Sequence, residues 1–168
     1  MKQIRFFVLS MLTVVLFSCS SPSSDGSKDA KNDNGQNNPT KEEAAVDVAG
    51  TPIHLNDADF LKKVYDYKSN PKLAYVGTKP CIVDFYADWC GPCKIIAPYL
   101  VELAAKYKDE IFIYKVNTDN NRDLSQFFNI ESIPSVMFCP MSGQPTMMIG
   151  ANPKDEYEKL INKILLNK

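Results

Sequence analysis

Two cysteines separated by two residues stand where a buried strand gives way to a helix. Residues 81–87 form a nearly continuous apolar run of β-type side chains, which is typical of a central strand buried on both faces. Residues 90–107 carry apolar side chains at helical spacing, and Pro98 inside them should kink the helix. Cys90 and Cys93 therefore occupy the first turn of a helix that follows a buried strand.

This placement makes the two cysteines chemically unequal. A cysteine at a helix N-terminus faces unpaired N–H groups and the positive end of the helix dipole, which favour thiolate over thiol. We expect Cys90 to be the exposed nucleophile, and Cys93, about one turn deeper, to be its shielded resolving partner. The alternative is a zinc site, but isolated Cys81 and Cys139 and distant His54 supply no second ligand pair. No metal is expected.

The rest of the pattern alternates strands with helices. We predict strands at 53–55, 81–87, 111–116, 135–139 and 146–149, and helices at 57–67, 90–107, 123–128 and from 153 onward. Residues 68–80 form a connection, and the last helix should bury Tyr157, Leu160, Ile161, Ile164 and Leu165. This order is α/β, with right-handed parallel crossovers first and a closing hairpin.

Composition argues against several classes of function. The 168 residues suit one domain with tails, and a net charge of −1 provides no field that would select nucleic acid. A single histidine, His54, argues against a multi-histidine metal site and against a Ser-His or Cys-His catalytic pair. Five cysteines at irregular spacing argue against a disulfide scaffold. No cofactor is expected.

The N-terminus has the pattern of an export signal. Lys2 and Arg5 precede the apolar run 6–17, which is shorter than the roughly 20 residues that a membrane-spanning helix needs. The alternative is a buried helix of the folded domain. Residues 16–19, Leu-Phe-Ser-Cys, resemble the lipobox of bacterial lipoproteins, although Phe17 is bulkier than usual there.

That resemblance implies a lipoprotein-type signal peptide at residues 1–18 and lipidation of Cys19. The alternative is an ordinary signal peptide, with Cys19 lost or spare. Residues 19–45 are almost devoid of apolar side chains after the first position and are predicted to be a flexible tether. The folded domain is then predicted to span residues 46–168.

Residues 53–168 resemble thioredoxin. The motifs that carry the resemblance are Val83-Asp84-Phe85, residues 89–94 (Trp-Cys-Gly-Pro-Cys-Lys), Ala97-Pro98, Lys115-Val116-Asn117, Ile133-Pro134 and Gly150-Ala151. The resemblance implies a thioredoxin fold, with a central mixed β-sheet flanked by helices on both faces. It also implies a thiol–disulfide oxidoreductase that works through Cys90 and Cys93.

The resemblance assigns roles to further residues around the pair. Asp84 matches a buried aspartate whose pKa its apolar neighbours should raise, and which relays a proton to and from Cys93; the alternative is an aspartate on an exposed strand face. Lys115 matches the charge partner of that aspartate, with a plain surface lysine as the alternative. Pro134 matches a cis-proline, and its peptide with Ile133 would offer backbone groups to an extended substrate.

A flat apolar rim would contact protein substrates. The resemblance places in it Trp89, Gly91, Pro92, Ile133, Gly150 and Ala151, with Trp89 as core filler being the alternative. The chain departs from the family at Tyr86, where tryptophan is often found, and in the longer connection 68–80. The family topology would bring Cys81 and Cys139 together, and two buried free thiols are favoured over a second disulfide.

The resemblance also implies a direction and a setting. Gly91-Pro92 is similar to the reducing members, so we expect reduction of disulfides in exported proteins, with electrons from a membrane donor protein. A disulfide oxidant or isomerase, or a thioredoxin-fold adaptor, are the alternatives. We expect a monomer in the bacterial periplasm, held by a lipid anchor in the outer membrane, as Ser20 and Ser21 after Cys19 suggest.

Overall fold

The computed structural model describes residues 50–70 and 72–168. The strands are β1 (Ile53–His54), β2 (Cys81–Tyr86), β3 (Phe112–Asn117), β4 (Ser135–Cys139) and β5 (Thr146–Ile149). The helices are α1 (Asp57–Lys63), α2 (Gly91–Lys106), α3 (Arg122–Phe127), α4 (Lys154–Leu160) and the π-helical turn η1 (Ile161–Leu165). The predicted order of elements is confirmed. The predicted signal peptide, Cys19 and the tether lie outside the described residues.

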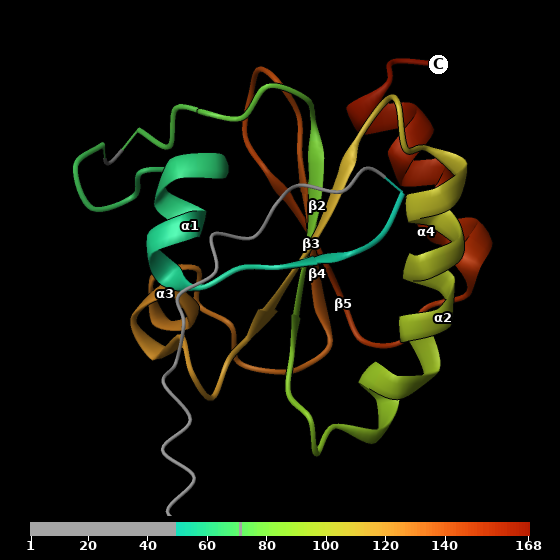
Figure 1. The fold of residues 1–168 in the computed structure, drawn as a ribbon, viewed down its shortest axis with the longest axis horizontal. Helices are drawn as coiled ribbons and strands as arrows, with labels where there is room; N and C mark the ends of the chain where they lie inside the picture. The colour runs from blue at the N-terminus through green and yellow to red at the C-terminus, as the bar shows by residue number, and fades with distance from the viewer. Residues whose placement is uncertain (1–49, 71) are drawn as a thin grey trace, which may run out of the picture. The chain divides into compact units, whose positions relative to one another are not determined.

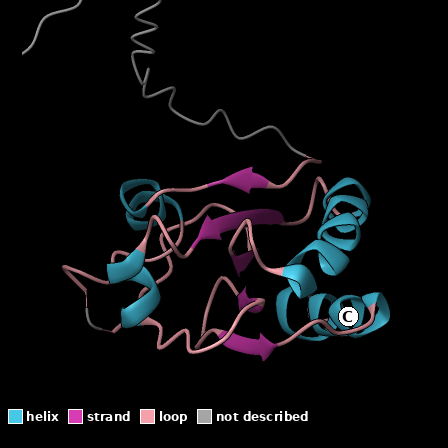
Figure 2. Cartoon of the chain, turned by 90° about the horizontal axis from the view of Figure 1, so that it is seen from below, coloured by secondary structure: helices cyan, strands magenta, loops and turns pink. Residues whose placement is uncertain are grey.

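The five strands form one mixed sheet in the order β1-β3-β2-β4-β5. β1, β3 and β2 are parallel, whereas β4 and β5 continue the sheet as antiparallel strands. Helices α1 and α3 lie on one side of this sheet and α2 and α4 on the other (Figure 1), and the strands stand between the two helical layers when the molecule is turned (Figure 2). The prediction of a mixed sheet with helices on both faces is confirmed.

Strand β2 supplies both hydrophobic cores, because its side chains alternate between the two faces of the sheet. Cys81, Val83 and Phe85 belong to the core under α1 and α3. Ile82 belongs to the core under α2 and α4, and Asp84, two residues on, shares that face. The sheet therefore places an ionisable side chain beneath α2, within a layer that is otherwise apolar.

Helix α1 begins as expected but ends earlier. The side chain of Asn56 caps it, whereas the predicted extension to residue 67 is wrong. Val64 and Tyr65 are fully buried, and Tyr65 forms an isolated antiparallel bridge with Tyr75. The helix does not continue because backbone groups after Lys63 pair with the 68–80 connection; the Val64 carbonyl, for example, accepts a hydrogen bond from the Val76 N–H.

The C-terminal helix also differs from its prediction. Tyr157, Ile161 and Leu165 are buried, but Leu160 and Ile164 are only partly buried. The last turn is π-helical, and its wider turn changes which side chains face the sheet. This explains why regular α-helical spacing predicts too broad a buried face.

Cys81 and Cys139 stand directly opposite each other on the antiparallel strands β2 and β4. Both are fully buried and both are free cysteines, in agreement with the favoured prediction of two buried thiols. No helix within residues 50–70 and 72–168 combines the length and apolarity required to cross a bilayer.

Candidate active site

The two cysteines of the Cys-Gly-Pro-Cys segment form a disulfide at the start of α2. Cys90 is the N-cap residue of the helix, and its sulfur accepts a hydrogen bond from the Cys93 N–H at 3.2 Å. The Cα atoms of the pair are 5.3 Å apart. Pro92 occupies the first turn, where its missing N–H removes no helical hydrogen bond. The structure therefore describes the oxidised form. Cys90 lies at the N-terminal end of α2, toward which the free N–H groups of the first helical turn point.

The predicted contrast between an exposed Cys90 and a buried Cys93 is wrong for this oxidised form. Both residues are only 3% exposed. They form a small cluster with Ala87, and Ile133 and Tyr86 pack against it. Cys90 is therefore covered by side chains from other segments, and this cover could not be inferred from its position at the end of a helix.

Asp84 is fully buried beneath the site. Neither carboxylate oxygen has a hydrogen-bond partner, and the nearest charge is Lys115 Nζ, 3.5 Å from Oδ2. That separation is an ion pair, longer than a good hydrogen bond. Burial raises the pKa of Asp84 to about 6 from an ordinary 3.8, and the Lys115 ammonium only partly opposes the rise. The structure places Lys115 against Asp84 with its side chain only 14% exposed, so it is not a plain surface lysine.

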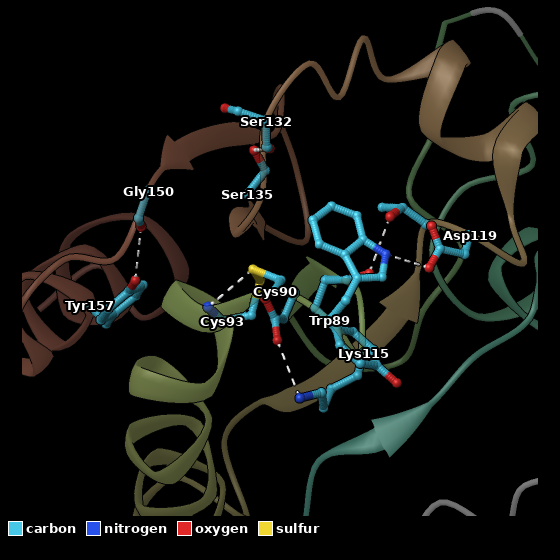
Figure 3. The surroundings of a disulfide bond; sticks show 12 residues. Trp89, Cys90, Cys93, Lys115, Asp119, Ser132, Ser135, Gly150 and Tyr157 are labelled. Carbon is cyan, nitrogen blue, oxygen red and sulfur yellow. Dashed lines mark hydrogen bonds and ion pairs between the residues drawn. A yellow bond between two sulfur atoms is a disulfide. The ribbon is translucent and has the colours of Figure 1, made fainter.

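The loop before β4 faces the disulfide. The Ile133–Pro134 peptide bond is cis, as the resemblance implies, and Ile133 packs against the cysteine pair. The Ser135 hydroxyl donates to the Ser132 carbonyl at 2.7 Å (Figure 3). The Gly150 N–H donates to the Pro134 carbonyl at 2.8 Å. These bonds bring the Gly150 turn beside the cis-proline.

Trp89 is not core filler. The residue is 71% exposed, and its indole N–H donates to the Asp119 carboxylate at 2.8 Å (Figure 3). Among the other predicted rim residues, Gly91, Pro92 and Ala151 are exposed and Ile133 and Gly150 are partly buried. Ile149, 65% exposed at the end of β5, adds an apolar side chain next to Gly150 that the sequence pattern did not identify.

Two further contacts were missed. Asp119 follows the C-terminal end of β3, at the same sheet edge as the end of β2, so the predicted topology could have suggested it. Tyr157 accepts from the Asn152 N–H at 3.3 Å and donates to the Gly150 carbonyl at 3.4 Å. The sequence predicts only that Tyr157 is buried, because it is spaced with other apolar residues along the last helix. Among the described residues there is no group of three or more His, Cys, Asp or Glu side chains that could hold a metal ion.

Comparisons with known proteins agree on one family. A family model described as Thioredoxin matches residues 51–163. Thioredoxin from Borreliella burgdorferi is 40% identical over 109 residues, which cover 65% of this chain and 93% of that protein. Thioredoxin-T from Drosophila melanogaster is 45% identical over 85 residues, 51% of this chain, and the chain spans only 54% of that protein.

A solved structure shares the fold. A mutant thioredoxin from Halobacterium salinarum NRC-1 superposes with a TM-score of 0.56 at 23% sequence identity, over 71% of this chain and 95% of that chain. At this identity the likeness concerns the fold alone. Together with the sheet order and the helical layers, it confirms the fold class predicted from the sequence.

Proposed function

This chain belongs to the thioredoxin family of thiol–disulfide oxidoreductases, and from that premise we propose that it reduces disulfide bonds in exported proteins. The observation that carries the proposal is the Cys90–Cys93 disulfide at the N-cap of α2, beside an exposed Trp89. A dithiol at that position can pass two electrons to a substrate disulfide and itself become the disulfide that the structure contains.

The proposed cycle begins with the Cys90 thiolate. It attacks one sulfur of a substrate disulfide, forms a mixed disulfide, and releases the other substrate sulfur as a thiolate that takes a proton from solvent. The Cys93 thiol then gives its proton to a base and attacks the Cys90 sulfur, and the second substrate sulfur leaves as a thiolate that also takes a proton from solvent. The substrate gains two electrons and two protons, and Cys90 and Cys93 end as a disulfide.

Asp84 is proposed to accept the Cys93 proton. Its pKa of about 6 places it near the pH at which a proton acceptor can take up and later release a proton. A cavity of about 120 Å³ is lined by both Cys93 and Lys115, the partner of Asp84, so the cysteine and the ion pair border the same space. Lys115 is proposed to keep a fraction of Asp84 ionised, as the acceptor role requires.

Substrate binding is assigned to the rim. Trp89, Gly91, Pro92, Ile133, Gly150 and Ala151 surround the pair with mostly apolar surface, to which Ile149 adds. An extended substrate segment would lie along the Ile133–Pro134 peptide and pair with its backbone as a strand does. The Trp89–Asp119 hydrogen bond limits the positions that the indole can adopt, which lowers the entropy lost on binding.

Direction and location extend the proposal beyond the family. Gly91-Pro92 between the cysteines resembles the reducing members, and export would separate the protein from soluble cytoplasmic donors, so a membrane protein is proposed to supply electrons. Lipidation of Cys19 would hold the chain in the bacterial periplasm, anchored to the outer membrane. Cys19→Ser tests the anchor, because it should move the protein from the membrane fraction to the soluble fraction.

The reduction potential of the Cys90–Cys93 pair tests the direction. The purified protein is equilibrated in glutathione or dithiothreitol buffers, and the fraction oxidised is measured. A reduction potential of about −270 mV, as in thioredoxin, supports a reductase. A potential of about −120 to −180 mV would make the protein an oxidant or isomerase instead.

A trapping experiment separates an enzyme from an adaptor. Cys93→Ala should leave Cys90 joined to substrates as mixed disulfides, which are seen on a non-reducing gel and disappear when a reductant is added. The double variant Cys90→Ala/Cys93→Ala is the matched control and should trap nothing. An adaptor would retain the same partners with either variant and would form no mixed disulfide.

A further inference from the structure

A row of ionisable side chains crosses three strands and ends at the buried acid. His54 on β1 is in register with Lys115 on β3, and Lys115 is in register with Asp84 on β2. Residues in register on neighbouring strands point to the same face of a sheet. His54 is exposed at the sheet edge, Lys115 is mostly buried, and Asp84 is fully buried. The row therefore runs from solvent to the carboxylate buried on the α2 side of the sheet.

Tyr86 lies across this row. It is two residues beyond Asp84 on β2 and so projects on the same side of the sheet. Lys115 Nζ is 4.2 Å from the centre of its ring, a cation–π contact. Its hydroxyl is 3.2 Å from His54 Nδ1, and the two rings meet edge to face with centroids 5.9 Å apart. Tyr86 thus covers the Lys115 ammonium, and His54 holds the far end of the tyrosine.

Lys115 depends on this cover for its position. Asp84 offers it only a 3.5 Å contact, and neither Asp84 oxygen receives a hydrogen bond. No short hydrogen bond therefore fixes the ammonium from the Asp84 side. Tyr86, Lys115 and Cys93 also line the same cavity of about 120 Å³, so displacement of the ring would open space for Lys115 to turn away from Asp84.

We propose that His54 is a positioning residue that, through its hydrogen bond to Tyr86, keeps Lys115 directed at Asp84. The proposal deepens the proposed function, and its effect on Cys93 chemistry rests on that function. When the Lys115 ammonium is held in place, it stabilises the Asp84 carboxylate. When it turns away, burial alone determines the pKa of Asp84. Loss of the His54–Tyr86 contact should therefore raise the pKa of Asp84.

Other charges surround both ends of the row. Asp88, Lys115 and Tyr86 act on His54. The pKa of His54 is lowered by the partial burial of its ring, although the residue is exposed at the sheet edge, and by Lys115, whereas Asp88 raises it. Asp84 faces Lys115 from β3, Tyr86 on its own strand, and Tyr157 from α4, while Cys93 and Lys94 of α2 border the adjoining cavity. On acidification His54 gains a positive charge beside Lys115, and the repulsion between the two charges should loosen the arrangement.

The experiment measures the pKa of Asp84 directly, from the pH dependence of its side-chain carboxyl ¹³C signal in the oxidised full-length protein. Tyr86→Phe keeps the ring over Lys115 and removes only the hydroxyl, whereas His54→Ala removes the partner. Each should raise the Asp84 pKa by about half a unit. The double variant should shift it no further than Tyr86→Phe alone, because Tyr86→Phe already removes the His54–Tyr86 hydrogen bond, together with the contact between the Tyr86 hydroxyl and Asn117.

Two more variants sharpen the test. His54→Asn places an amide near the position of Nδ1 without a titrating group, and should return the Asp84 pKa to the wild-type value. Tyr67→Phe, the matched control, removes a tyrosine hydroxyl that donates to Asp57 in the other core, and should leave Asp84 unchanged. An unchanged or lowered Asp84 pKa in the two single variants, or additive shifts in the double variant, overturns the proposal. Because this readout needs no turnover, absence of reductase activity would refute the proposed function and leave this result standing.

Discussion

Replacement of Asp84 by asparagine should stabilise the protein at pH 8, although Asp84 is the proposed proton acceptor. The carboxylate is fully buried and accepts no hydrogen bond, whereas in the unfolded chain it is hydrated. Burial outweighs the attraction of Lys115 and raises the pKa of Asp84 from 3.8 to about 6. Asparagine has nearly the same shape and carries no charge, so Asp84→Asn removes this penalty.

The size of the effect follows from the pKa. The rise from 3.8 to about 6 is about two units, and at 1.36 kcal/mol per unit the ionised form is destabilised by about 3 kcal/mol on folding. The amide of Asp84→Asn would find few partners where the carboxylate finds none, which costs about 1–2 kcal/mol. A net gain of about 1–2 kcal/mol in the free energy of unfolding at pH 8 remains.

The pH dependence has a definite sign. Between about pH 4 and about pH 6 the native state binds a proton at Asp84 that the unfolded state has released, so stability falls as the pH rises through this window. In Asp84→Asn this contribution to the slope disappears. The free energy of unfolding is measured by urea titration of the oxidised protein, followed by circular dichroism, at pH values from 4 to 8.

Asp109→Asn provides the control, because Asp109 is an exposed aspartate and its loss should leave the slope in place. The reasoning fails if wild type is at least as stable as Asp84→Asn at pH 8. It also fails if both proteins keep the same slope between pH 4 and 6. In either case burial of the Asp84 charge would not be a net penalty.

Three further changes test the site and the core. Lys115→Met should raise the pKa of Asp84 above about 6, since the ammonium opposes the effect of burial, and should move the acid limb of the rate of disulfide reduction to higher pH; an unmoved limb would contradict the pairing. Asp119→Ala should lower the fluorescence anisotropy of Trp89, the one tryptophan in the sequence, and equal anisotropy would show that the hydrogen bond does not hold the indole. Phe60→Ala should lower the free energy of unfolding by about 3–5 kcal/mol in urea titrations, and a loss below about 1 kcal/mol would place Phe60 outside the core.

Much of the fold could be predicted, because several local signals agreed. Strand 81–87 is uniformly apolar apart from Asp84, and its prediction differs from β2 by one residue. The strands predicted at 135–139 and 146–149 were expected to form a closing hairpin, and β4 and β5 do pair as antiparallel neighbours. The topology that follows places Cys81 opposite Cys139, a pairing that the register confirms. The burial and raised pKa of Asp84 were also predictable, since its neighbours on β2 are apolar.

The remaining differences come from contacts between distant segments. Helix α1 ends at Lys63 because Tyr65 pairs with Tyr75, which helical spacing cannot show. Cys90 is buried because the cluster that contains it is covered by Ile133, from the loop before β4. The contact between His54 and Tyr86 joins residues 32 positions apart in the sequence and depends on side-chain direction. Sequence pattern determines which face a side chain occupies, but not which neighbour it reaches.

The position of β2 between two hydrophobic cores affects how the protein unfolds locally. Because its alternate side chains lie in two separate cores, local loosening of either helical layer leaves the strand held by the other. Its amide hydrogens should therefore exchange with solvent only through global unfolding, whereas those of the edge strand β5 exchange through smaller openings. The Cys90–Cys93 disulfide thus lies just beyond the strand that we expect to exchange its amide hydrogens most slowly among the described strands.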